Sequence, residues 1–282
     1  MAWISRRSFL SAGVSTLVLR GSQARMRWAL LSDTHLPENP AEEYRGFKPQ
    51  ENLQRVVPQV TAANVEGALI CGDLARLQGL PGDYAALKKI LEPVMARMPL
   101  ALALGNHDDR KNFLAAFGPM PGAQPVGGKH VVVVEGPAMR LIVLDSLLAP
   151  NVTPGQLGTV QREWLVKFLA EAPVRPSLVF VHHTLNDNDG SLMDARKLID
   201  AVKGHRSVKG IVYGHSHAWH LDSVDDMHLL NIPAIGYNFN DREPVGWVEC
   251  ELTPEGANFT LRAFAGNRAE DGKTISLAWR PR

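Results

Sequence analysis

Short apolar segments alternate with helical patterns through the first part of the chain. The apolar segments are typical of strands buried on both faces, and they cover residues 27–32, 68–71 and 100–104. Between them, apolar residues recur at helical spacing over residues 50–63 and 84–97. This β-α-β-α-β order predicts a parallel sheet in which helices form the crossover connections.

The later part of the chain first continues this alternation and then changes character. Strands are predicted at residues 130–134, 140–145, 178–182 and 208–213, and helices at 155–170 and 192–202. We expect the first of these helices to open at Thr153-Pro154, because proline is favoured near a helix start. Beyond His217, antiparallel strands are predicted at residues 220–224, 228–232, 246–252 and 258–264. No segment has the composition of a linker, so we expect one domain with two packed sheets.

The first 24 residues have the order of an export signal. Arg6-Arg7 forms a twin-arginine pair, a short apolar stretch follows over residues 9–19, and small residues then form a cleavage site at 22–24. Arg20, between the apolar stretch and that site, favours twin-arginine export over the general secretory route. We therefore divide the chain into a signal peptide (1–24) and a mature domain (25–282), and expect a periplasmic or secreted protein that meets the export machinery. The alternative is an exposed helix that carries two arginines.

Charge and composition exclude several classes of protein. The 282 residues include 45% apolar and 21% charged residues, which is ordinary for a globular protein. Loss of the signal leaves 27 of the 30 basic residues against 29 acidic ones, a formal charge of −2, so we expect no nucleic-acid polymer as partner. No apolar run reaches the length of a membrane span, so we expect no stable membrane anchor. Cys71 and Cys250 could pair, but both lie in apolar strands and more closely resemble small buried hydrophobic residues.

Polar side chains with metal-binding chemistry follow five of the predicted strands. They are Asp33-Thr34-His35, Gly72-Asp73, Gly105-Asn106-His107-Asp108, His182-His183 and Gly214-His215-Ser216-His217. Each group alone has an ordinary structural explanation, such as a turn dipeptide or a helix cap. Together they indicate one site, because the carboxyl ends of parallel strands meet at one edge of a sheet. Carboxylate, imidazole and amide ligands without a thiolate favour Mn, Fe, Zn or Co.

The order of these motifs resembles that of the calcineurin-like metallophosphoesterases. The pattern is Asp-x-His, Gly-Asp, Gly-Asn-His-Asp, His and Gly-His-x-His, and it runs from Asp33 to His217. Among family members, the chain looks most like bacterial enzymes similar to cyclic-nucleotide phosphodiesterases and to purple-acid-phosphatase-like enzymes. The resemblance implies an α/β (α+β) fold, a four-layer αββα sandwich of two mixed sheets flanked by helices.

The resemblance also implies a role for each motif residue in a centre of two divalent or trivalent metal ions. One ion would be held by Asp33, His35, Asp73 and His217. The other would be held by Asp73, Asn106, His182 and His215. Asp73 would bridge the two ions, because a carboxylate has two oxygens to share. His107 would face the substrate and protonate the leaving oxygen or stabilise the transition state. The family ligand is normally the first histidine of the doublet, so His183 would be a supporting or structural residue.

The implied activity is hydrolysis of a small phosphate ester, diester or monoester, by a hydroxide that bridges the metals. Two alternatives remain: a binding protein that has kept the fold but lost catalysis, and a nuclease. We expect specificity to lie in the loops at 36–49, 74–83 and 185–191. For Asp108 and Asp109 we weigh orientation of His107 against capping of a following helix. Trp219 and His220 could contact substrate or belong to the core and the surface.

Overall fold

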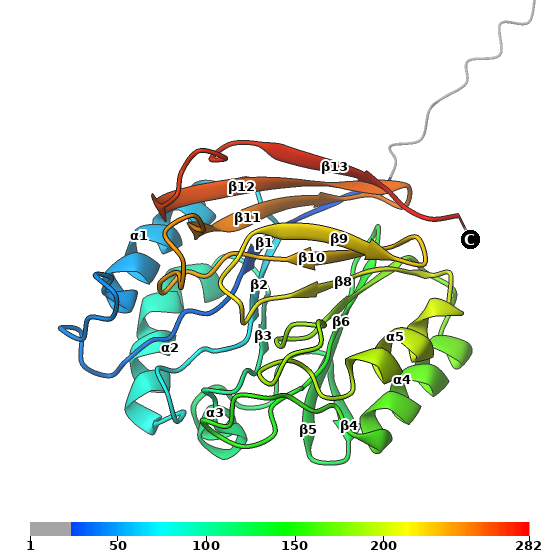
Figure 1. The fold of residues 1–282 in the computed structure, drawn as a ribbon, viewed down its shortest axis with the longest axis horizontal. Coiled ribbons are helices and arrows are strands. Elements are labelled where there is room, and N and C mark those ends of the chain that lie inside the picture. The colour runs from blue at the N-terminus through cyan, green and yellow to red at the C-terminus, as the bar shows by residue number, and fades with distance from the viewer. Residues whose placement is uncertain (1–23, 282) are drawn as a thin grey trace, which may run out of the picture.

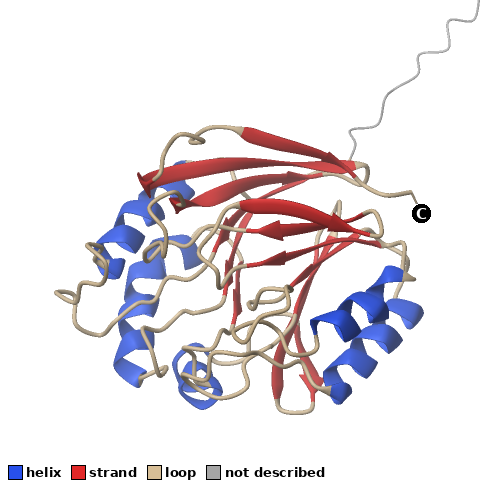
Figure 2. Ribbon diagram, in the orientation of Figure 1, coloured by secondary structure: helices blue, strands red, loops and turns tan. Residues whose placement is uncertain are grey.

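Two mixed sheets pack face to face, and helices cover their outer faces (Figures 1 and 2). The computed structural model describes residues 24–281. In Figure 1, α1 and α2 lie on one flank, α4 and α5 lie on the other, and the strands fill the space between them. The expected four-layer αββα sandwich is therefore confirmed.

The first sheet has six strands in the order β13-β12-β11-β1-β2-β3. β1, β2 and β3 run parallel, and β11, β12 and β13 extend the sheet from β1 with antiparallel pairing. The strands are β1 (Met26–Leu31), β2 (Gly67–Cys71), β3 (Leu100–Ala103), β11 (Pro244–Leu252), β12 (Gly256–Gly266) and β13 (Thr274–Ala278). The helices on this side are α1 (Pro49–Ala62), α2 (Pro81–Met95) and α3 (Arg110–Phe117).

The second sheet has seven strands in the order β4-β5-β6-β7-β8-β10-β9. β6, β7, β8 and β10 are parallel, while β4, β5 and β9 pair antiparallel with their neighbours. The strands are β4 (Ala123–Val126), β5 (Lys129–Glu135), β6 (Arg140–Val143), β7 (Ser177–Phe180), β8 (Val208–Tyr213), β9 (His220–Val224) and β10 (Met227–Asn231). The helices on this side are α4 (Thr159–Glu171) and α5 (Ala195–Lys203).

Three apolar cores separate the four layers. Because side chains alternate along a strand, Leu30 of β1 enters the core between the sheets, while Ala29 and Leu31 enter the core under α1, α2 and α3. The third core lies between the second sheet and α4 and α5. Each central strand is thus buried on both faces, which explains the continuous apolar segments in the sequence.

Several predicted elements need correction. The helix expected over 155–170 begins only at Thr159, because Gly155 bonds to the chain near Ser191 (N to O, 3.2 Å) and Met193 (O to N, 2.9 Å) instead of starting a helix. β10, expected to be antiparallel, pairs parallel with β8 and antiparallel only with β9. The hydrophobic pattern also predicts no strand at β4 or β13, and it gives no bounds for the helix weighed after Asp109, which is α3. β4 and β13 are short edge strands whose outer face is exposed, so their hydrophobic signal is weak.

The expected signal peptide falls almost wholly on residues 1–23, which lie outside the described residues, so it stays a prediction. Between residues 24 and 281, none of the helices has the length and hydropathy that a membrane crossing requires. Cys71 and Cys250 are both buried and unpaired, as preferred from the sequence.

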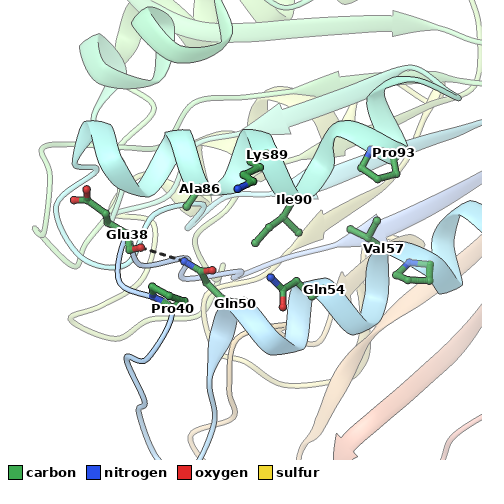
Figure 3. Close-up of a pocket in the computed structure, with 10 residues that line it drawn as sticks. Glu38, Pro40, Gln50, Gln54, Val57, Ala86, Lys89, Ile90 and Pro93 are labelled. Atoms are coloured by element: carbon green, nitrogen blue, oxygen red, sulfur yellow. Dashed lines mark hydrogen bonds between the residues drawn. The ribbon is translucent and has the colours of Figure 1, made fainter.

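A groove of about 550 Å³ lies between α1 and α2 on the outer helical surface (Figure 3). Its charged lining residues are Glu38 and Lys89, and none of its lining residues belongs to the predicted site. Gln50 Nε2 at its edge donates to the carbonyls of Pro37 (2.8 Å) and Glu38 (3.3 Å). These bonds hold the loop that follows His35 against α1.

Candidate metal centre

The loops that follow β1, β2, β3, β7 and β8 bring the predicted site residues to one edge of the sandwich. Five of these residues turn the backbone into the left-handed region immediately after a strand. They are Asp33, His35, Asp73, His215 and His217, with φ of 52°, 43°, 47°, 68° and 54°. For residues with a side chain this conformation costs roughly 1–2 kcal/mol each. Its concentration at five convergent positions marks a site at which the surrounding structure offsets that cost.

One group of donors consists of Asp33, His35 and His217, and all three side chains are buried. Asp33 Oδ1 lies 3.3 Å from His217 Nε2 and 3.9 Å from His35 Nε2. The two Nε2 atoms approach each other to 3.0 Å, so both rings point into the same small space. The chain supports this arrangement at the back: His217 Nδ1 donates to the carbonyl of Tyr237 at 2.5 Å, and Ser32 Oγ donates to Asp33 Oδ2 at 2.5 Å.

Asp73 lies between this group and a second group that contains His182 and His215. Its Oδ2 atom is 3.6 Å from His35 Nε2 and 3.3 Å from His182 Nε2. Its Oδ1 atom accepts the backbone N–H of His107 at 2.9 Å, which fixes the carboxylate plane. Asp73 therefore faces histidines of both predicted ligand sets.

Two buried atoms have the environment that a metal ligand needs. Asn106 Oδ1 and His182 Nε2 are buried, and within residues 24–281 neither has a hydrogen-bond partner; His35 Nδ1 is a third such atom. Buried polar atoms are almost always satisfied, so unsatisfied ones at a convergent site need an explanation. His182 Nδ1 donates to the carbonyl of Cys71 at 2.7 Å, which leaves Nε2 free to act as a ligand. The donor set thus fits a bound metal ion.

Burial and mutual charge set the protonation of these groups. Burial alone would raise the pKa of Asp33 and of Asp73, but nearby histidines outweigh it and hold both below the ordinary value. Burial lowers the pKa of His35, and with the neighbouring His182 it lowers the pKa of His215 to about 4. At neutral pH Asp33 and Asp73 are therefore carboxylates, and His35 and His215 are neutral imidazoles, the forms that bind metals. Burial opposes the charge on His182 too, but Asp73 and Asp33 raise its pKa to about 9, so this histidine would release a proton as a metal binds.

His107 sits at the open side of the site. Its Nδ1–H donates to the carbonyl of Leu77 at 3.0 Å, which turns Nε2 toward Asp73 Oδ2 at 3.9 Å. Its side chain is 19% exposed, whereas those of His35 and His182 are buried, so His107 is placed where a substrate can reach it. The same distances group His107 with His35 and Asp73 as possible donors, so proximity alone does not separate a ligand from a proton donor.

The neighbours of the motif histidines have structural contacts of their own. Both ring nitrogens of His183 are occupied, by Ser146 Oγ (2.7 Å) and by the carbonyl of Thr153 (2.9 Å). Asp109 caps α3 by accepting the N–H of Asn112 at 2.8 Å.

Asp108 joins the loop that follows β2 to the loop that follows β3. It accepts the N–H groups of Leu74 (3.1 Å), Ala75 (3.1 Å) and Gly105 (2.8 Å) and the hydroxyl of Tyr84 (3.0 Å). It contacts the loop backbone and not the His107 ring. Farther out, Trp219 packs against the core between the sheets, and His220 is exposed on β9.

Glycine at two motif positions lets the chain pass close to the donors. A Cβ on Gly105 would lie 2.2 Å from Asp73 Oδ1, and one on Gly72, whose φ is 89°, would lie 2.6 Å from His182 Nδ1. No side chain can be accommodated at such distances without moving a donor. The sequence signal of glycine beside a polar residue therefore reflects close packing behind the site.

An aromatic wall on the His217 side escaped the sequence analysis. Tyr237 packs on His35 (4.7 Å between ring centroids) and on His217 (4.8 Å), and Phe239 stacks on His217 (4.1 Å). The loop over residues 236–243 that carries these rings was not among the loops expected to set specificity. The available signal was the Tyr-Asn-Phe alternation at residues 237–239, between the strands predicted at 228–232 and 246–252. The loop at 185–191, which was expected, does lie beside the site, because Gly190 approaches His215 Nε2.

Comparisons with known proteins agree with this geometry. The chain is 30% identical over 259 residues to the 3′,5′-cyclic adenosine monophosphate phosphodiesterase CpdA of Escherichia coli, a match that covers 86% of this chain and 90% of that protein. It is 27% identical over 245 residues to a probable cyclic nucleotide phosphodiesterase of Synechococcus, covering 84% and 91%. A dimetal phosphatase from Danio rerio has the same fold, with a TM-score of 0.70 at 15% identity, covering 92% of this chain and 100% of that one.

Fold, site and relatives together define a class of protein, the metal-dependent phosphoester hydrolases. The model of the calcineurin-like phosphoesterase family matches residues 26–219, a range that includes every predicted site residue. The chain belongs to that family.

Proposed function

We propose that this protein is an exported phosphodiesterase that hydrolyses small phosphodiesters at a centre of two metal ions. The observation that carries the proposal is the placement of Asp73 between two groups of donors, His35 on one side and His182 on the other. A single ion would leave one of the two groups without an ion to bind, whereas Asp73 faces histidines of both. Diesters are favoured over monoesters because the relatives that match most of the chain are named phosphodiesterases.

In this proposal the donors divide as the motifs predict. Asp33, His35, Asp73 and His217 hold one ion, and Asp73, Asn106, His182 and His215 hold the other. When bound, two such ions neutralise charge on the phosphoryl oxygens and make a water molecule acidic enough to attack phosphorus near neutral pH. Mn, Fe, Zn and Co all suit this donor set.

The chain's own contribution to the bond-breaking step comes from His107. The attacking water gives up one proton to solvent as it forms the new P–O bond, the bond to the leaving oxygen breaks, and the imidazolium form of His107 gives its Nε2 proton to that oxygen. The carbonyl of Leu77 holds the proton on Nδ1, so the other ring nitrogen faces the site. A positioned acid of this kind contributes roughly 10²–10⁴ in rate.

The predicted export bears on which substrate the enzyme would meet. A twin-arginine signal, if used, carries the folded protein with its metals already bound and delivers it outside the cytoplasm. The substrate would then be a phosphodiester present in the periplasm or the medium. The mature chain expected after export is slightly acidic, which argues against a polymeric nucleic acid as substrate. The complete set of metal donors argues against the alternative of a catalytically silent binding protein.

Elemental analysis and a substrate panel test the proposal together. Protein reconstituted with Mn should hold two ions per chain and cleave bis(p-nitrophenyl) phosphate and a small natural diester. Asp73→Ala should lose both ions and the activity, whereas the matched control Asp200→Ala, at an exposed position on α5, should keep both. A stoichiometry that never exceeds one ion would contradict the two-metal centre. Hydrolysis of monoesters alone would contradict the proposed substrate class.

A further inference from the structure

Phe239 is an exposed aromatic ring fixed directly against the metal centre. One face stacks on His217, with 4.1 Å between ring centroids and 23° between ring planes. The residue is nevertheless 48% exposed, so the surface that remains away from His217 is open to solvent. The exposed part of this ring, directly beside the metal centre, is therefore available for a group of the substrate to pack on it.

The side chain of Arg45, from a distant part of the sequence, holds the loop that carries Phe239 in place. Arg45 Nε donates to the carbonyl of Asn238 at 2.9 Å, and Arg45 Nη2 donates to the carbonyl of Phe239 at 2.7 Å. The Asn238 side chain is buried and donates to the carbonyl of Glu243 at 2.8 Å. Phe239 is therefore fixed at its backbone from two directions.

Arg45 is itself held in a tight turn. Tyr44 and Phe47 exchange backbone hydrogen bonds of 2.8 and 3.0 Å, and the two residues between them, Arg45 and Gly46, have φ of 56° and 80°. Two consecutive positive φ values in a two-residue hairpin identify a type I′ turn. A left-handed arginine costs free energy, and the bonds of its side chain to the 238–239 backbone help to offset that cost.

A second exposed ring lies on the other side of Tyr237. Tyr44, 40% exposed, contacts the edge of Tyr237 at 4.7 Å between centroids, and the Arg76 guanidinium packs on the Tyr44 ring at 4.9 Å. Arg76 is in turn bonded to Glu42 at 2.6 Å. The wall beside the metal centre thus has two exposed aromatic surfaces on a rigid support of rings and paired charges.

We propose that Phe239 is a stacking platform for the nucleobase of a nucleoside phosphodiester, and that Arg45 is the residue that positions it. The inference rests on the proposed phosphodiesterase function and adds the residue that would recognise the base of a nucleoside ester and the residue that positions it. A nucleobase fits better than an alkyl chain, because the open surface is one face of a fixed planar ring with cationic side chains nearby, not an apolar groove. Stacking of a base on such a ring strengthens binding roughly 10- to 100-fold.

Two phosphodiesters with the same leaving group separate this role from catalysis. Thymidine 5′-(p-nitrophenyl phosphate) carries a base, methyl p-nitrophenyl phosphate does not, and both release p-nitrophenol. The wild-type Mn enzyme should prefer the thymidine ester about 10-fold or more in kcat/KM. Phe239→Ala should remove most of that preference, mainly through KM, and should leave the methyl ester within about threefold.

Matched variants assign the effect to the ring and to its support. Phe239→Tyr keeps an aromatic face and should keep the preference. Arg45→Ala should weaken the preference while leaving the methyl ester nearly unchanged, a result that general damage to the site would not give. Val166→Ala, at an exposed position on α4, should change neither substrate. Metal content is measured for each variant, because Phe239 touches His217.

The outcomes separate this inference from the proposed function. If wild type cleaves both esters but Phe239→Ala lowers them by the same factor, or changes neither, the platform is wrong and the hydrolase stands. If wild type cleaves neither ester, the phosphodiesterase proposal fails. Calorimetry with thymidine 5′-monophosphate and deoxyribose 5-phosphate then still decides the platform. Tighter binding of the nucleotide, lost in Phe239→Ala, supports it, and equal binding of the two ligands by wild type overturns it.

Discussion

Replacement of Gly105 by alanine should disable the centre although it removes no donor. The new Cβ would lie 2.2 Å from Asp73 Oδ1 and 2.5 Å from the Asp73 backbone nitrogen, closer than the 3.0 Å that real Cβ contacts observe. Relief requires Asp73 or the 105–108 turn to move by at least about 0.8 Å, the difference between 3.0 and 2.2 Å. Metal–ligand distances tolerate only about 0.2 Å, so the shared carboxylate would no longer serve both groups.

The expected size of the effect follows from this displacement. A misplacement of about 1 Å at a reacting centre costs on the order of 10² in rate, so kcat/KM on bis(p-nitrophenyl) phosphate should fall at least that far. Overpacking of a buried site should also lower the free energy of unfolding by about 1–3 kcal/mol. Metal content from elemental analysis should drop below that of wild type after the same Mn reconstitution.

Gly204→Ala is the matched control. Gly204 ends α5 with ordinary helical φ of −73°, and nothing lies within 4 Å of its added Cβ. The same change there should leave metal content and kcat/KM unaltered and raise the free energy of unfolding by about 0.4–1 kcal/mol, because alanine restricts the unfolded chain. Our account of the site would be refuted by a Gly105→Ala protein that binds Mn fully and turns over within threefold of wild type.

Four further expectations can be checked separately. His107→Ala should keep its metals and lose roughly 10²–10⁴ in turnover on alkyl esters. The loss should be much smaller on p-nitrophenyl esters, because their leaving group needs little protonation. Loss of metal would instead make His107 a ligand. Dialysis against a chelator should abolish activity and lower the melting temperature, both restored by Mn; activity that survives complete removal of metal would exclude the proposed chemistry. Burial raises the pKa of the Cys71 and Cys250 thiols, so thiolate is scarce and a thiol reagent should label them only after unfolding; rapid labelling of the native protein would show that the strands open. Replacement of Arg6 and Arg7 by lysine should trap the precursor in the cytoplasm, and unchanged export would point to the general secretory route.

Much of the fold could be predicted from the sequence alone, because the signals that specify its strands and turns are local. An apolar run followed by glycine and a polar residue specifies a buried strand and the turn that ends it, as at Gly72-Asp73 after β2. Boundaries were less well determined where a distant contact decided them. Gly155 looks like the start of a helix, but its backbone bonds to the chain near Ser191, so the helix begins later.

For the site, the sequence named the side chains and the tertiary structure decided what surrounds them. The five motifs determine which carboxylates, imidazoles and amide can meet, because each motif ends a strand of the sandwich. The orienting partners are backbone carbonyls, such as those of Cys71 and Tyr237, and a carbonyl has no signature in the sequence. The Arg45 side chain bonds to the carbonyl of Phe239, 194 positions away in the sequence, and only the tertiary structure brings the two residues together. Local pattern therefore determined the chemistry available to this protein, and long-range packing decided which surface the substrate meets.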